Sequence, residues 1–131
     1  MKKLILFVSM VILGITANAQ AGYQTFTLDT VKGAETIYFT STVNCPYYGI
    51  ATFDFTLDGF NTDSCTVTLQ GKNQGTTWLT VGTQIQPYKS TAATAYQLIA
   101  NPASYLNYRI KVEGKATDTV KVTLPLFIYK R

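Results

Sequence analysis

Polar and apolar residues alternate along most of this chain, and that period of two constrains the fold more than any other feature of the sequence. In "ATFDFTLD" the apolar residues Ala51, Phe53, Phe55 and Leu57 alternate with polar ones. Successive side chains of a strand point to opposite faces, so the pattern predicts a strand with one buried face. The segments "CTVTLQ", "YLNYRIKVEG" and "TVKVTLPLFIYK" alternate in the same way.

Four further segments, 24–28, 35–42, 77–81 and 95–100, bring the expected number of strands to about eight. Turn signals such as "LDGFNTDS", "GKNQGT" and "EGKATD" separate the strands, and no helical pattern follows the first 19 residues. The sequence therefore predicts an all-β fold with one domain over residues 20–131. We expect an antiparallel β-sandwich that is jelly-roll-like or immunoglobulin-like.

The last strand is the most apolar segment of this domain. Alternation predicts an inward set along it, which consists of Val120, Val122, Leu124, Leu126 and Ile128. Pro125 lies between them and has no N–H for a ladder, so we expect an edge or a bulge there. An exposed apolar edge can pair with another chain, so these five residues form a candidate assembly edge.

Residues 1–19 have the pattern of a secretory signal peptide. Lys2 and Lys3 precede an apolar run over residues 4–15, and Ala17-Asn18-Ala19 forms a cleavage signal. The alternative is an uncleaved hydrophobic helix that anchors the chain in a membrane, but the run is short beside the roughly 20 residues that a span needs. We expect a secreted, periplasmic or cell-surface protein.

The charge and the missing histidine exclude several function classes. The formal net charge of +4 includes both leader lysines, and the other basic residues are scattered, so nucleic acid is not an expected partner. The chain has no histidine, which removes the usual general base and zinc ligand. Asp54 and Asp58 on one strand would lie about 13 Å apart, too far for a glycosidase pair. We expect no enzymatic activity.

Two small constellations suggest structural chemistry. Cys45 and Cys65 are the only cysteines; in an exported protein they predict a disulfide, and the alternative is a pair of buried free thiols. Asp58, Asn61 and Asp63 share one loop and could bind calcium through oxygen ligands. The alternative is that they only stabilise the turn. No other cofactor is expected.

Aromatic residues near turns are the candidate ligand contacts. Tyr47 and Tyr48 stand together before a strand, and Trp78 is the only tryptophan. Such side chains offer flat, amphipathic area to a sugar or a protein. The alternative is that they cover the ends of the sandwich. If Leu79 and Val81 face the core, Trp78 faces outward with Thr80 and lies partly covered beside its own hairpin.

The segments "VTLQGKNQGTTWLTVGT", "YLNYRIKVEG" and "TVKVTLPLFI" together resemble a pattern of β-sandwich proteins. In that pattern a strand enters a "G-x-(N/D)-x-G-T-x-W" hairpin, and a later strand carries "Y-x-R-(I/V)-x-V". Discoidin-like (F5/8 type C, galactose-binding-like) domains and phage virion-type proteins have it. The resemblance covers about residues 66–128 and implies a jelly-roll-like sandwich.

These observations predict an exported, non-catalytic β-sandwich that acts by assembly or interaction at the cell envelope, outside the cell or in a virion. Its partners would be copies of itself or envelope or virion proteins, and a membrane would be involved only through an uncleaved leader. The alternative is a glycan-binding or adhesion module that uses Tyr47, Tyr48 and Trp78.

Overall fold

The computed structural model describes residues 21–46, 48–59, 65–82, 84–87, 92–115 and 119–131. The predicted signal segment therefore lies outside the described residues. The described part forms nine strands: β1 (Ala21–Thr25), β2 (Asp29–Lys32), β3 (Thr36–Thr40), β4 (Ile50–Asp58), β5 (Thr66–Lys72), β6 (Leu79–Thr80), β7 (Thr94–Ala100), β8 (Asn107–Glu113) and β9 (Thr119–Lys130). A search of these residues finds no helix that could cross a membrane.

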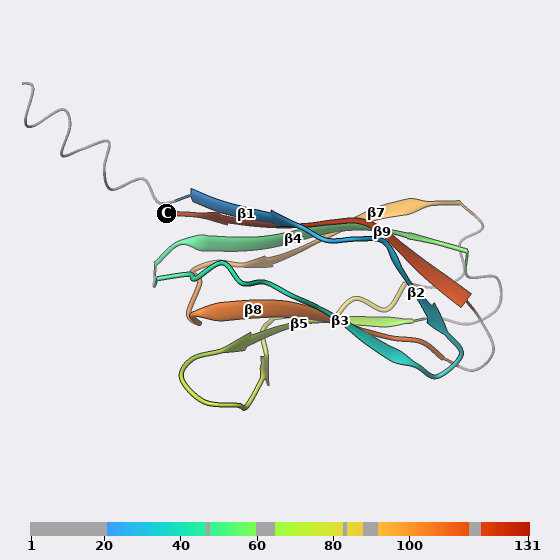
Figure 1. Cartoon of the computed structure of the whole chain (residues 1–131), viewed down its shortest axis with the longest axis horizontal. Coiled ribbons are helices and arrows are strands. Elements are labelled where there is room, and N and C mark those ends of the chain that lie inside the picture. Colours follow the sequence, from blue (N-terminus) through green and yellow to red (C-terminus); the bar gives the residue numbers. More distant parts are fainter. Residues whose placement is uncertain (1–20, 47, 60–64, 83, 88–91, 116–118) are drawn as a thin grey trace, which may run out of the picture.

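The strands form two antiparallel sheets that face each other (Figure 1). One sheet has the order β1-β9-β4-β7, with β2 also paired to β9, and the other has the order β3-β8-β5-β6. β1 and β2 pair with successive parts of β9. Counted as one interrupted strand they give eight strands in two sheets, as in a jelly roll. The predicted all-β antiparallel sandwich is confirmed.

The core lies between the sheets and uses the inward positions that alternation predicts for the central strands. Phe53 and Leu57 of β4, and Ile110 and Val112 of β8, are fully buried. The ring centroids of Phe53 and Phe127 are 4.7 Å apart. Because each strand contributes every second residue to this layer, the remaining residues form two outer sheet faces.

A β-bulge in β9 reverses the predicted phase of the last strand. Asp54 pairs with Leu126, whereas Thr56 pairs with Thr123, so two residues of β9 lie opposite Phe55. The extra residue turns Phe127 and Tyr129 into the core, where both are buried. The prediction that Leu126 and Ile128 point inward is therefore wrong, because a bulge moves every later side chain to the other face. The bulge expected at Pro125 is confirmed.

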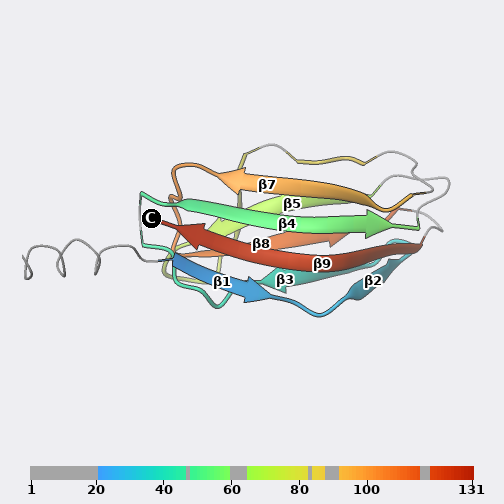
Figure 2. The same cartoon turned by 90° about the horizontal axis from the view of Figure 1, so that it is seen from above.

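The predicted assembly edge is also wrong. β9 lies between β4 on one side and β1 and β2 on the other (Figure 2). Its backbone pairs on both sides, so it offers no edge to another chain. Val120 and Val122 are buried in the core, and the side chain of Leu124 lies outside the described residues. The edge strands of this sheet are β7 on one side and β1 and β2 on the other.

The predicted disulfide is not formed, and Cys45 and Cys65 are free and buried. The topology gives the reason. The Cys45 N–H donates to the carbonyl oxygen of Leu106, next to the start of β8. Cys65 precedes Thr66, which pairs with Glu113 at the end of β8. Seven residues of a strand span roughly 23 Å, far beyond the roughly 7 Å between α-carbons that a disulfide tolerates.

Candidate functional site

The outer face of the β1-β9-β4-β7 sheet carries a row of apolar side chains. Tyr23, Ile128, Thr52 and Ile99 lie opposite one another across the four strands. Tyr23 is 79% exposed and Ile99 is 51% exposed, while Ile128 is half-buried. An apolar row across the middle of a sheet face is unusual because outward positions of a sandwich are normally polar.

The neighbouring rows extend this apolar surface and add one charge of each sign. On one side Lys130 lies between Ala21 and Ile50. On the other side Leu126 lies beside Asp54. We call Tyr23, Ile50, Ile99, Leu126 and Ile128 the apolar strip. The middle row of this strip contains Ile128 and Thr52. Lys130 lies two residues from this row toward one end of the sheet, and Asp54 lies two residues from it toward the other end.

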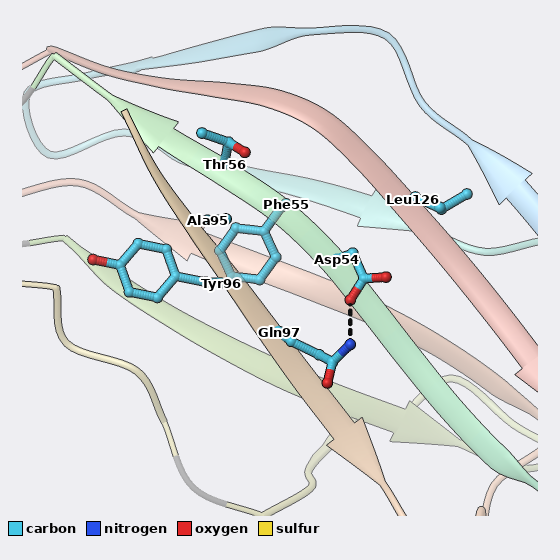
Figure 3. A pocket seen from close by; sticks show the side chains of 7 residues that line it. All are labelled: Asp54, Phe55, Thr56, Ala95, Tyr96, Gln97 and Leu126. Atoms are coloured by element: carbon cyan, nitrogen blue, oxygen red, sulfur yellow. Dashed lines mark hydrogen bonds between the residues drawn. The ribbon is translucent and has the colours of Figure 1, made fainter. Parts of the chain in front are cut away.

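A shallow depression of about 510 Å³ adjoins the apolar strip at the bulge (Figure 3). Its polar wall contains Asp54 and Gln97, whose side chains meet in a hydrogen bond of 2.7 Å from Gln97 Nε2 to Asp54 Oδ1. Leu126 lies on the other side of Asp54, on β9 (Figure 3). Phe55 and Tyr96 also border the depression, but their rings, which stack at 5.9 Å, belong to the core side of the sheet, where Phe55 is buried. The depression therefore has a carboxylate acceptor, Asp54, and an apolar neighbour, Leu126.

The outer face of the opposite sheet has a different character. The guanidinium carbon of Arg109 lies 4.3 Å from the ring centroid of Trp78 and 4.2 Å from that of Tyr38. Lys72 Nζ lies 4.8 Å from the Trp78 ring. We call Tyr38, Lys72, Trp78 and Arg109 the cationic cluster. Trp78 faces outward as predicted, because it contacts Lys72 and Arg109 on the outer face, where Gln70 pairs with Thr80. The expectation that Leu79 is a core residue is not met, because Leu79 lies at the edge of the sheet and is 51% exposed.

Arg109 is held on three sides in this cluster. Besides the two rings, Gln70 Oε1 accepts a hydrogen bond of 2.8 Å from Arg109 Nε. Partial burial lowers the pKa of the Arg109 guanidinium, and the nearby Tyr38 opposes that shift. In the described part of the chain the one salt bridge joins Lys111 and Glu113 at 2.7 Å. Arg109 thus has no carboxylate partner among these residues.

Of the predicted tyrosine pair, only Tyr48 can be placed relative to Trp78. Tyr47 lies outside the described residues. Tyr48 is 87% exposed and has a φ of 77°, a left-handed conformation that is uncommon for tyrosine. It lines a small hollow with Pro102, Ala103 and Ser104. No ring contact joins Tyr48 to the cationic cluster within the described ranges.

The described residues contain no group of three or more potential metal ligands. Asp58 ends β4, opposite Lys121 of β9, whereas Asn61 and Asp63 lie outside the described residues. The calcium site therefore stays a prediction. Asp54 and Asp58 lie on one strand, four residues apart, and Asp54 is hydrogen-bonded to an amide.

The sequence offered a weak signal for the apolar strip and a stronger one for Arg109. Tyr23 and Ile99 each lie in or next to a segment expected to be a strand, but nothing local shows that they share a row. That row depends on the pairing of four strands and on the bulge. In "YLNYRIKVEG" Arg109 alternates with the apolar Tyr108 and Ile110, so its outward direction follows from the pattern, but its contact with Trp78 depends on the β5–β8 register.

No protein-family model and no curated protein sequence matches the chain. Solved structures share its fold. A CBM4 structure is 10% identical with a TM-score of 0.53, over 86% of this chain and 78% of that one. A Family 16 Carbohydrate Binding Module-2 is 10% identical with a TM-score of 0.51, over 74% and 73%.

The enzymatically active domain of Bacteriophage CBA120 tailspike protein 4 is 11% identical with a TM-score of 0.53. The match covers 85% of this chain but only 19% of the tailspike chain. The expected resemblance to carbohydrate-binding and phage β-sandwich proteins is therefore confirmed at the level of the fold. At these identities the similarity carries no residue roles, and one fold hosts many functions.

Proposed function

We propose that this protein is an exported, non-catalytic assembly protein that associates with a second copy of itself. The observation that carries the proposal is the apolar strip on the outer face of the β1-β9-β4-β7 sheet. Exposed contiguous apolar surface on a soluble domain commonly marks an interaction site. The edge of β9 predicted from the sequence is paired inside the sheet. The proposed assembly surface is therefore the outer face of the sheet and not a strand edge.

The strip fits a two-fold dimer in which the two faces pack against each other. We place the axis along the row of Tyr23, Ile128, Thr52 and Ile99. Each residue of this row lies on the axis and would meet its own copy, and every contact away from the axis would occur twice, as in any isologous interface. The rotation reverses the strand direction, so the Lys130 row of one copy would face the row of Leu126 and Asp54 of the other.

Charge complementarity supports this arrangement over a parallel one. In the reversed packing the Lys130 ammonium of each copy would reach toward the depression of its partner, where Asp54 offers a carboxylate oxygen. An axis along the strands would instead place like rows, and hence Lys130 and Lys130, against each other. Opposite charges at an interface fix register more than they add affinity.

The size of the face limits how tightly two copies would associate. Four strands about 4.8 Å apart and about ten residues long cover roughly 600 Å². Each partner in a standard stable interface buries about 800 Å². We therefore expect a dimer that dissociates on dilution into the micromolar range, and the measurement has to span a range of concentrations.

The test is the mass of the protein purified without its leader, measured by light scattering after size-exclusion chromatography at several concentrations. The wild type should shift from monomer to dimer as its concentration rises. Asp54→Lys and Lys130→Asp should each weaken the dimer at least tenfold, about 1.4 kcal/mol. The double variant Asp54→Lys/Lys130→Asp should restore it, because the swapped charges again face each other.

Lys32→Asp is the matched control. It makes the same charge change as Lys130→Asp at an exposed position near the other end of the sheet, and it should leave the dimer unchanged. A wild type that stays monomeric at every concentration would refute self-assembly through this face. A dimer that responds equally to all three single changes would refute the two-fold arrangement.

A further inference from the structure

We propose that the cationic cluster on the outer face of the β3-β8-β5-β6 sheet binds the carboxylate of an acidic saccharide, such as a uronate chain. This surface lies on the opposite side of the sandwich from the apolar strip (Figure 1). The two proposals are therefore independent, and a dimer built on the strip would leave both clusters open.

The arginine is preorganised for a planar anion. Arg109 is held between Trp78 at 4.3 Å and Tyr38 at 4.2 Å, and its Nε is held by Gln70. These contacts leave the two terminal NH₂ groups of the guanidinium as donors. A planar guanidinium matches the two oxygens of a carboxylate. Because the side chain is already ordered, a ligand loses less rotamer entropy on binding to it.

The charge of the cluster favours an anionic ligand. Lys72 and Arg109 approach the same indole ring, and no described carboxylate pairs with either of them. The nearest acidic side chain on β8, Glu113, is taken by Lys111. Two cations on a partly desolvated surface attract an anion more strongly than isolated surface charges do.

The polar character of the surrounding surface favours a saccharide over a peptide. Hydroxyl, amide and charged groups fill the accessible outward positions of this sheet around the two rings, namely Thr36, Thr40, Thr66, Gln70, Lys72, Thr80, Asn107, Arg109, Lys111 and Glu113. The one exposed large aliphatic side chain on these four strands is Leu79, next to Trp78. A peptide needs apolar pockets as anchors, whereas sugar hydroxyls pair with amides and hydroxyls.

Trp78 is the only tryptophan of the chain, so its fluorescence reports binding directly. The probe is an oligogalacturonate, and its fully methyl-esterified form is the neutral control with the same backbone. The oligogalacturonate should change Trp78 emission in a saturable way that weakens with added salt. The methyl ester should cause no saturable change, because its esters carry no charge.

Arg109→Gln should lower the affinity for oligogalacturonate at least tenfold, and Arg109→Lys should lower it nearly as much because a lysine lacks the planar fork. Lys121→Gln removes one positive charge from the other sheet and should have no effect. Equal urea midpoints among these variants would show that they fold alike.

Three results would overturn the proposal. The first is the absence of saturable binding by oligogalacturonate, and the second is unchanged binding by Arg109→Gln with a wild-type urea midpoint. The third is equal binding of a polyglutamate peptide of the same charge, which would assign the surface to acidic peptides. Isothermal titration calorimetry provides the binding readout for any variant whose emission differs before ligand is added.

Discussion

At the level of single residues, Cys45 and Cys65 are buried free thiols and not the disulfide that the sequence predicts. Both side chains have no exposed area. Burial raises the pKa of the Cys45 thiol to about 12 and that of Cys65 to about 11. The thiolate is the reactive form of cysteine, so burial and the raised pKa make both thiols unreactive toward solvent reagents at neutral pH.

We expect neither cysteine to be alkylated by iodoacetamide at pH 8 in the native state, and both to react in urea. Mass spectrometry of the labelled protein counts the modified thiols. A single rapidly labelled cysteine in buffer would contradict the buried position of that residue. The leaderless protein, reduced beforehand, is the sample that makes the two conditions comparable.

The same pKa shifts give a pH dependence. The folded-state pKa values lie above 9.0, the ordinary value for these thiols. The unfolded chain therefore releases these protons first as the pH rises. The contribution of these two thiols to the free energy of unfolding should be constant below pH 9 and should fall between pH 9 and 12. Cys45→Ala/Cys65→Ala should show a shallower fall in urea denaturation across that range.

At the scale of elements, β9 matters most, because the bulge at Pro125 decides which of its side chains enter the core. Before the bulge the even-numbered Val120 and Val122 are buried, and after it the odd-numbered Phe127 and Tyr129 are buried. The proline has no N–H to leave unpaired, and its carbonyl oxygen accepts a hydrogen bond of 3.0 Å from the Phe26 N–H.

The phase of β9 predicts very different losses of stability for substitutions at two adjacent residues. Phe127→Ala should cost about 3–5 kcal/mol of unfolding free energy, because it removes a fully buried ring and leaves a cavity. Ile128→Ala should cost less than about 1 kcal/mol in the monomer, because its side chain lies on the outer face and is half-buried. Urea denaturation at low protein concentration measures both costs.

The reverse order of these two costs would mean that the simple alternation of the sequence holds through the whole strand. Such a result would place Ile128 in the core and would also remove it from the apolar strip. Val122→Ala, which lies before the bulge, should be costly under either phase. It therefore serves as a reference for a buried position in the same strand.

The elements also show what alternation can and cannot reveal. β4 and β8 were predictable with their inward faces, because an unbroken period of two needs no knowledge of partners. β2 was missed, because four residues with a single buried side chain, Val31, give too short a pattern. The phase of β9 and its place inside the sheet depend on pairing with β4, so no local pattern could show them.

At the scale of the whole molecule, the two outer faces differ in chemistry although the same alternation produces both. The outward positions of the β1-β9-β4-β7 sheet carry an apolar row with tyrosine and isoleucine, whereas those of the opposite sheet carry mostly threonine, arginine and lysine beside the rings of Tyr38 and Trp78. Alternation predicts that outward positions exist, but their grouping into rows follows from the strand order alone.

The N-terminal boundary of the domain provides the last prediction. β1 closes one side of its sheet by pairing with β9 from Lys130 to Leu126. It also connects the two sheets: Gln24 Oε1 accepts hydrogen bonds from the Thr42 N–H at 2.7 Å and the Thr42 hydroxyl at 3.1 Å. A chain that begins at Gln20, the predicted start after leader cleavage, keeps all of these contacts.

A protein over residues 20–131 should therefore unfold at the same urea concentration as one over residues 15–131, while one over 27–131 should lose several kcal/mol. The shorter chain lacks the β1 ladder and Phe26, whose ring stacks on Phe53 at 6.0 Å and contributes about 1.5–3 kcal/mol if buried. It also exposes the backbone of β9 as a new edge, so it should aggregate.

Equal stability of the 20–131 and 27–131 chains would show that β1 is dispensable. The variant Gln24→Ala in the 20–131 chain is the control, because it removes the hydrogen bonds to Thr42 and keeps the β1 strand.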